Sequence, residues 1–157
     1  GCGASPADAE LLARLANGRM GWALDQLHHP ERRSERTQHL ETLRRLLGAD
    51  RIERLTFAAS LAAKRDRDNR ELFGMLALWT AWWRDVMLVQ AGCDDAVSNA
   101  DQLGEVHRQA AAIDGGAVRS ALQTLQQIDS YLHHTVNTRL ALEVLMLKLP
   151  KLEGSHP

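Results

Sequence analysis

The chain has 157 residues, of which 45% are hydrophobic and 25% are charged. This length and composition suit one ordinary soluble domain with a small appended piece. The 19 basic and 20 acidic residues leave a net charge of −1, so the chain lacks the basic excess of a domain that binds nucleic acid on its own. No apolar run approaches the roughly 20 residues that span a bilayer, which argues against a membrane protein.

The N-terminal region predicts two short helices ahead of a polar linker. Ser5-Pro6 pairs an N-cap residue with a proline in the first turn, and a helix is expected over residues 6–16. A second helix is expected over residues 20–27, and His29-Pro30 ends it. Residues 31–39 are polar and are expected to link the small N-terminal piece to the main domain, and their charges of mixed sign indicate a solvated helix face. The chain starts with Gly rather than Met, which indicates a piece of a longer protein.

The next segment predicts a buried face on a helix that begins near Asp50. Apolar residues recur there at spacings of three and four, so we expect one side of this helix to be buried. The expected stripe is Ile52, Leu55, Ala59 and Ala62, widened by Ala58 and Leu61. It follows a shorter apolar set in the preceding segment, namely Leu40, Leu43 and Leu47.

Residues 71–90 form the most apolar predicted helix, and Gly92 is expected to close it. Its apolar residues occupy nearly all sides, which predicts a central position in the fold. Three tryptophans lie in it, Trp79, Trp82 and Trp83. Stacked aromatic side chains can bind single-stranded bases, but such surfaces interleave with Lys and Arg, and here the neighbours are apolar. Core packing or a protein interface is the preferred interpretation.

Three more helices are predicted in the last third of the chain. Asn99 with Gln102 indicates a variant capping box that opens a helix reaching about Ile113. Gly115-Gly116 predicts a turn, and a long amphipathic helix follows it with apolar residues at helical spacing.

Asn137 or Thr138 is expected to open the last helix, and Pro150 to stop it. That helix has almost no polar face. The pattern as a whole predicts an all-α protein of about eight helices, arranged as a bundle.

Motifs of catalysis and cofactor binding are few. Neither a P-loop nor a Rossmann fingerprint occurs. The pairs His28-His29 and His133-His134 are adjacent in sequence, and neighbours on a helix point about 100 degrees apart, so they chelate a metal poorly. Cys93 precedes two aspartates, whose charge would raise rather than lower a thiol pKa. Arg84-Asp85 resembles a structural ion pair more than a catalytic one. No cofactor, metal or catalytic residue is expected.

The chain has two cysteines, Cys2 and Cys93, and two cysteines at these positions do not make a disulfide framework. Reduced thiols are therefore expected, together with a cytoplasmic location.

Three segments, taken together, resemble clamp-loader subunits of bacterial DNA polymerase III, of the delta-prime type. LLARLANGRMGWAL at residues 11–24 is similar to the end of their AAA+ lid. WWRDVMLVQAG at residues 82–92, with Asn99-Ala100-Asp101 after it, is similar to a helix and turn of the helical collar domain. NTRLALEVLMLKLP at residues 137–150 is similar to the closing helix of that collar.

The resemblance implies a non-catalytic scaffold in two parts. Residues 1–29 would be the end of the lid, and residues 30–157 the collar, through which subunits assemble into the pentamer that loads the sliding clamp onto primed DNA. The implied partners are the delta and gamma/tau subunits, while clamp and DNA are reached only through the whole complex, itself part of the DNA polymerase III holoenzyme. The residues implied in interface or structural roles are Trp83, Arg84, Asp85, Asn99, Asp101, Asn137, Arg139, Leu140 and Leu145.

One position indicates the delta-prime type. The hydrolysing subunits have a sensor arginine three residues after a lid glycine, and Gly21 stands there in this chain, after Gly18-Arg19-Met20. Arg19 is offset by about 200 degrees on a helix and does not replace it.

The alternatives are a gamma/tau collar, an unrelated helical protein-interaction adaptor, and a helical ligand-binding domain with the tryptophans lining a pocket. The first belongs to the same complex and would also work by assembly. An upstream AAA+ domain would favour the clamp-loader interpretation, whereas an upstream helix-turn-helix segment would favour the ligand-binding domain.

Overall fold

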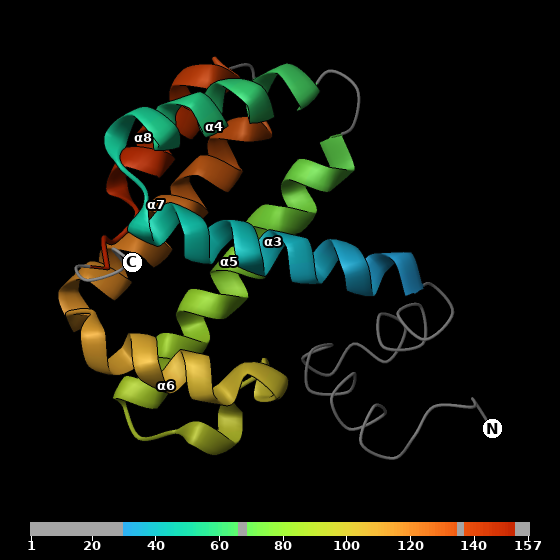
Figure 1. Ribbon diagram of the computed structural model, residues 1–157. Helices are drawn as coiled ribbons and strands as arrows, with labels where there is room; N and C mark the ends of the chain where they lie inside the picture. Colours follow the sequence, from blue (N-terminus) through green and yellow to red (C-terminus); the bar gives the residue numbers. More distant parts are fainter. Residues whose placement is uncertain (1–29, 66–68, 135–136, 153–157) are drawn as a thin grey trace.

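The computed structural model describes residues 30–65, 69–134 and 137–152 (Figure 1). Within these ranges the chain forms six α-helices and two short 3-10 helices, with no strand, so the prediction of an all-α protein is confirmed. The two helices predicted over residues 6–16 and 20–27, like Cys2 and His28-His29, lie outside the described residues.

Helix α5 (Asn69–Gln90) lies at the centre of the bundle (Figure 1). The other elements are α3 (Pro30–Gly48), α4 (Arg51–Arg65), η1 (Asp94–Ala96), η2 (Ala100–Gln102), α6 (Leu103–Ala112), α7 (Gly115–Leu132) and α8 (Thr138–Lys148). Helices α3, α6 and α7 pack against α5, and α8 packs along α4 and against α7. The chain thus folds around one apolar helix.

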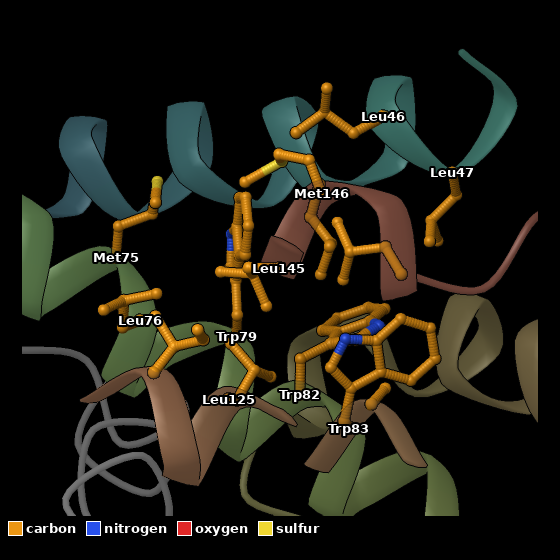
Figure 2. Packing of buried hydrophobic residues seen from close by; sticks show 14 of the residues in the cluster. Leu46, Leu47, Met75, Leu76, Trp79, Trp82, Trp83, Leu125, Leu145 and Met146 are labelled. Atoms are coloured by element: carbon orange, nitrogen blue, oxygen red, sulfur yellow. The ribbon is translucent and has the colours of Figure 1, made fainter. Parts of the chain in front are cut away.

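The inward side of α5 forms the middle of the core. Trp79, Trp82 and Trp83 are fully buried, which confirms that these tryptophans pack in the interior. Figure 2 shows them in one cluster with Leu145 and Met146 of α8. Among the described helices, α5 alone has the length and composition to cross a membrane, but the core helix of a soluble protein passes the same test. Its inward half is covered by neighbouring helices.

Helix α3 is longer than the sequence predicted. Residues 31–39, expected to form a linker, continue without a break into the apolar half of the helix, and Pro30 occupies its first turn. The first half is largely exposed, whereas the second half buries Leu40, Leu43, Leu46 and Leu47. The polar segment is therefore helical, with its charges on a solvated surface.

Helix α4 is rotated relative to the predicted stripe. Ala58 and Leu61 are buried, as predicted, but Ile52, also expected to be buried, is 76% exposed, and Arg54 is buried in its place. Arg54 accounts for this orientation of α4. A buried guanidinium needs hydrogen-bond acceptors, and Arg54 finds them in the main-chain carbonyls of Leu46 and Leu149. The predicted stripe thus lies partly on the surface.

The C-terminal end of α5 and the N-terminal end of α8 follow ordinary capping chemistry. After α5, Gly92 adopts a positive φ of 73°, and the amides of Gly92 and Cys93 donate to the carbonyls of Val89 and Leu88. This confirms Gly92 as the residue that closes α5. Asn137 caps α8, since its side chain accepts from the Leu140 amide at 3.1 Å, as predicted.

The predicted turn at Gly115-Gly116 is wrong. Both glycines lie in the first turn of α7, and Asp114 caps the helix by accepting from the Gly116 and Ala117 amides at 2.8 and 3.2 Å. A carboxylate at this position satisfies orphan donors and also favours the positive end of the helix dipole, so the helix begins earlier than the glycines suggest.

Candidate functional site

Asp85 is the centre of a buried polar network between α5 and the segment before α6. Its side chain is fully buried and accepts hydrogen bonds from the Ser98 amide at 3.1 Å and from the Asn99 amide at 2.8 Å. The side-chain amide of Asn99 donates to the same carboxylate at 2.7 Å. A buried carboxylate is tolerated only when it is hydrogen-bonded in this way. Asp85 therefore fixes the loop that follows η1 onto α5.

Arg36 joins this network to α3. Its guanidinium donates to the Asn99 side-chain oxygen at 2.8 Å and forms a two-point contact with the Asp101 carboxylate at 3.0 and 2.9 Å. Its side chain is mostly buried. The paired geometry is the strong form of the arginine–carboxylate contact. Arg36, Asn99 and Asp85 thus connect α3, the loop and α5 in series.

The predicted capping role of Asn99 is wrong. Asn99 precedes η2, and its side chain makes no capping bond, while α6 begins only at Leu103. The physical reason is the demand of Asp85 and Arg36, which occupy the two ends of the Asn99 amide. The Asn99-Ala100-Asp101 turn therefore connects elements instead of starting a helix.

Arg84 lies beside this network at the surface. Its guanidinium is 3.4 Å from the Asp85 carboxylate and also bonds to the Ser98 hydroxyl. Because Asp85 is already bonded to three N–H donors, the pair is structural. The neighbouring Trp83 is buried, and its indole N–H has no hydrogen-bond partner among the described residues. The structure thus brings Arg84, Asp85, Asn99 and Asp101 together, and places Trp83 in the core beside them.

A second buried polar centre lies at Arg54, which the sequence prediction missed. Its Nε donates to the Leu46 carbonyl at 2.8 Å, and its Nη atoms donate to the carbonyls of Leu149 at 2.8 Å and Pro150 at 2.9 Å. Further bonds reach the Leu47 and Met146 carbonyls. Burial lowers the pKa of Arg54 from its ordinary value, yet a guanidinium remains protonated in proteins. Arg54 therefore caps the ends of α3 and α8 at once.

Helix α8 exposes an apolar stripe. Leu140, Val144 and Leu147 are 58%, 37% and 43% exposed, and their spacing of four and three places them along one line of the helix. Below, these three residues are called the α8 stripe. Arg139 lies beside it, paired with Glu143 at 2.9 Å.

Leu145 lies on the other side of α8 and is fully buried in the core (Figure 2). Its role is therefore structural within this domain. The exposed large apolar side chains of α8 are those of the α8 stripe, and Leu145 is not among them.

The described residues hold no group of three or more His, Cys, Asp or Glu side chains placed to bind a metal. His133 bonds through Nδ1 to the Asp129 carbonyl, and its ring packs on Phe73 with centroids 4.5 Å apart. Cys93 is exposed. The sequence prediction missed Arg36 and Arg54, because Arg36 bonds to residues 63 and 65 positions away and three acceptors of Arg54 lie 92 to 96 positions away.

This is an all-α domain whose buried polar side chains hold helices and loops together, with an exposed apolar stripe on its last helix. Residues 30–151 match the family model described as DNA polymerase III, delta subunit, C terminal, and the chain belongs to this family. The chain is thus related to a clamp-loader subunit, which confirms the resemblance at that level. No curated protein and no solved structure matches the chain.

Proposed function

We propose that this chain is the C-terminal part of a delta-prime subunit of the bacterial clamp loader, and that it works in the cytoplasm as an assembly domain without a catalytic role. Residues 30–157 would form the collar that joins delta and gamma/tau subunits in the pentamer, and residues 1–29 would be the end of the AAA+ lid. In support, the family match begins at Pro30. Clamp and DNA would be reached only through the complex.

The α8 stripe is the observation on which the assembly role rests. Leu140, Val144 and Leu147 follow a well-capped helix start, so their exposure belongs to an ordered surface. Apolar area removed from water contributes roughly 25 cal/mol per Å², and three aligned side chains of this size suit a partner helix. The motif that resembles the closing collar helix contains the same residues. The surface is therefore proposed to meet a neighbouring subunit.

The delta-prime assignment rests on two sequence features. Gly21 occupies the position of the sensor arginine in the hydrolysing subunits, and Asn137 opens an Asn-x-Arg-Leu run that ends in the α8 stripe. The delta subunit is the second candidate, because the matching family model carries that description.

The test is reconstitution of the whole chain with purified delta and gamma/tau subunits of its own organism, followed by size-exclusion chromatography. We expect co-elution with gamma/tau, and we expect Leu140→Asp with Val144→Asp to abolish it at an unchanged Tm. Both side chains are exposed, so their replacement should spare the core. Leu145→Asp, by contrast, should unfold the domain, because it buries a charge.

Tyr131→Asp is the control, since Tyr131 is also a large exposed side chain but lies on α7. It should leave co-elution intact. Assembly of the stripe variant at wild-type yield would contradict the proposed interface. Assembly only when the delta subunit is omitted would show that the chain takes the place of delta.

A further inference from the structure

The exposed large apolar side chains of this domain are concentrated on one pair of helices. Among the described residues there are six such side chains, and four of them lie on α4 and α8, namely Ile52, Leu140, Val144 and Leu147. The other two, Met87 and Tyr131, lie on two other helices. Single apolar residues scattered over a surface are ordinary, whereas a group on adjacent elements indicates an interaction site.

Helices α4 and α8 pack side by side (Figure 1). Arg54 near the start of α4 donates to the carbonyl of Leu149 at the end of α8, so the two helices run in opposite directions. Ile52 lies two residues before the buried Arg54, and Leu147 lies two residues after the buried Leu145. Two residues correspond to about 200 degrees on a helix, so Ile52 and Leu147 both point away from the core. Ile52 and the α8 stripe are together called the α4–α8 surface below.

The two helices have a positive charge that the rest of the chain lacks. Their sequences contain six basic and two acidic residues, a net charge of +4, whereas the whole chain has −1. The two acids already have partners, because Glu53 is paired with Arg45 and Glu143 with Arg139. Asp50, just before α4, accepts a hydrogen bond from the Glu53 amide at 2.8 Å. The acidic side chains of the pair are therefore engaged within this domain.

Several basic side chains around the α4–α8 surface have no such partner. Arg51, Lys64, Lys148 and Lys151 are exposed, and the part of the chain that the structure describes provides none of them with an ion pair. Since the helices are antiparallel, Arg51 lies at the same end of the pair as Lys148 and Lys151, and Lys64 lies toward the other end. Unneutralised charges of one sign attract a partner of the opposite sign. The surface thus presents apolar side chains between cations.

This combination favours an acidic amphipathic helix over other anionic partners. Nucleic acid is bound through cations and stacked aromatic side chains, and the four apolar side chains of the α4–α8 surface are all aliphatic. A helix that docks on another protein lays an apolar side onto an apolar stripe, and its charged residues meet complementary charges at the edge. Such a helix uses both the aliphatic side chains and the cations.

We propose that the α4–α8 surface binds an acidic amphipathic helix of the neighbouring subunit. The apolar side of that helix covers Ile52 and the α8 stripe, and its Asp or Glu side chains meet Arg51 and Lys148. The α8 stripe is about 10 Å long, so about three turns of a partner helix cover it. The inference rests on the assembly role proposed above and names the kind of segment that fulfils it.

The test is the Kd of the full chain for purified gamma/tau and delta subunits of its own organism, measured by calorimetric titration at low and high salt. In the wild type we expect the Kd to rise with salt, because ions screen the attraction. Lys148→Glu and Arg51→Glu should each raise the Kd by about fivefold or more at low salt, since an attraction becomes a repulsion. The difference from wild type should shrink at high salt, and the Tm of each variant shows that the fold is kept.

Arg119→Glu is the matched control, because Arg119 is an exposed cation of α7 that likewise has no ion pair among the described residues. It changes the net charge by the same amount and should leave the Kd unchanged. Wild-type binding that neither salt nor the two reversals weakens would overturn the inference and leave the assembly role standing.

Two further outcomes would also count against the inference. If the wild type binds neither subunit, the assembly role and the inference both fail. The same proteins are titrated with primed DNA. If Lys148→Glu abolishes binding to DNA and leaves binding to the subunits intact, the cations serve nucleic acid and the inference is wrong.

Discussion

At the scale of single residues, Arg54 illustrates how much a buried cation contributes when all its donors are used. Its guanidinium donates to carbonyls that close α3 and α8, groups that otherwise have no intrahelical partner. A local pattern could not reveal this, since Arg54 follows Glu53 in a helix that resembles any charged surface helix. Its acceptors are the C-terminal carbonyls of two other helices.

We expect Arg54→Lys to lower the free energy of unfolding by roughly 3 kcal/mol, measured by urea denaturation. An ammonium group has three donors at one point and cannot reach carbonyls of both helices. Arg51→Lys, on an exposed side chain of the same helix, should stay within about 0.5 kcal/mol of wild type. Equal effects of the two substitutions would show that the carbonyl contacts contribute little.

His39 gives the domain a pH dependence whose sign follows from its environment. Burial lowers the pKa of the His39 imidazole below its ordinary value of 6.5, and the charges of Glu71 and Glu35 oppose this only in part. The folded state therefore binds the proton less readily than the unfolded state does. The contribution of neutral His39 to the stability of the fold is fully present above about pH 6.5, and it is lost as the pH falls through the pKa of His39 in the folded state.

The measurement is the free energy of unfolding of wild type and of His39→Gln between pH 5 and pH 8. The difference between the two proteins should be constant at neutral pH and should shift below about pH 6.5 in favour of the variant, since glutamine does not titrate. Parallel curves over the whole range would contradict a lowered pKa at this position.

At the scale of elements, the sequence predicts best where a helix has a clear period and an ordinary end. The bounds of α5 and the cap of α8 could be read from the residues, because Gly92 and Asn137 act through bonds to nearby amides and carbonyls. The orientation of α4 could not, because burying Arg54 outweighs burying Ile52. Alanine-rich helices offer several nearly equivalent faces, and tertiary contacts select one.

The loop between α5 and α6 depends on one carboxylate. We expect Asp85→Asn to lower the free energy of unfolding by roughly 2–3 kcal/mol, because an amide leaves one acceptor for three N–H donors and adds two donors of its own. Hydrogen exchange in residues 93–102 should become faster. Asp95→Asn, at an exposed position of the same loop, should change neither quantity. An unchanged loop in the Asp85 variant would contradict its anchoring role.

At the scale of the whole molecule, the class of fold could be predicted, whereas the sites that join its parts could not. Periodicity predicts most of the described helices and the central position of α5, although the polar first half of α3 has no apolar period. The residues that carried the family motifs were found from resemblance, and the structure brings four of them, Arg84, Asp85, Asn99 and Asp101, into one network. Their partner Arg36 was missed, because it lies 63 and 65 positions away in a segment predicted to be a linker.

The hydrogen bonds of Arg54 to the ends of α3 and α8 also affect the order in which the domain forms during synthesis. Three of its acceptors lie 92 to 96 positions further along the chain, so they are translated well after Arg54. Until Pro150 has left the ribosome, the first two helices of the domain have an arginine without its partners and a core without its closing helix. Contacts over such separations form late in folding. A nascent chain interrupted within α8 would therefore remain incomplete and would be a substrate for chaperones and proteases.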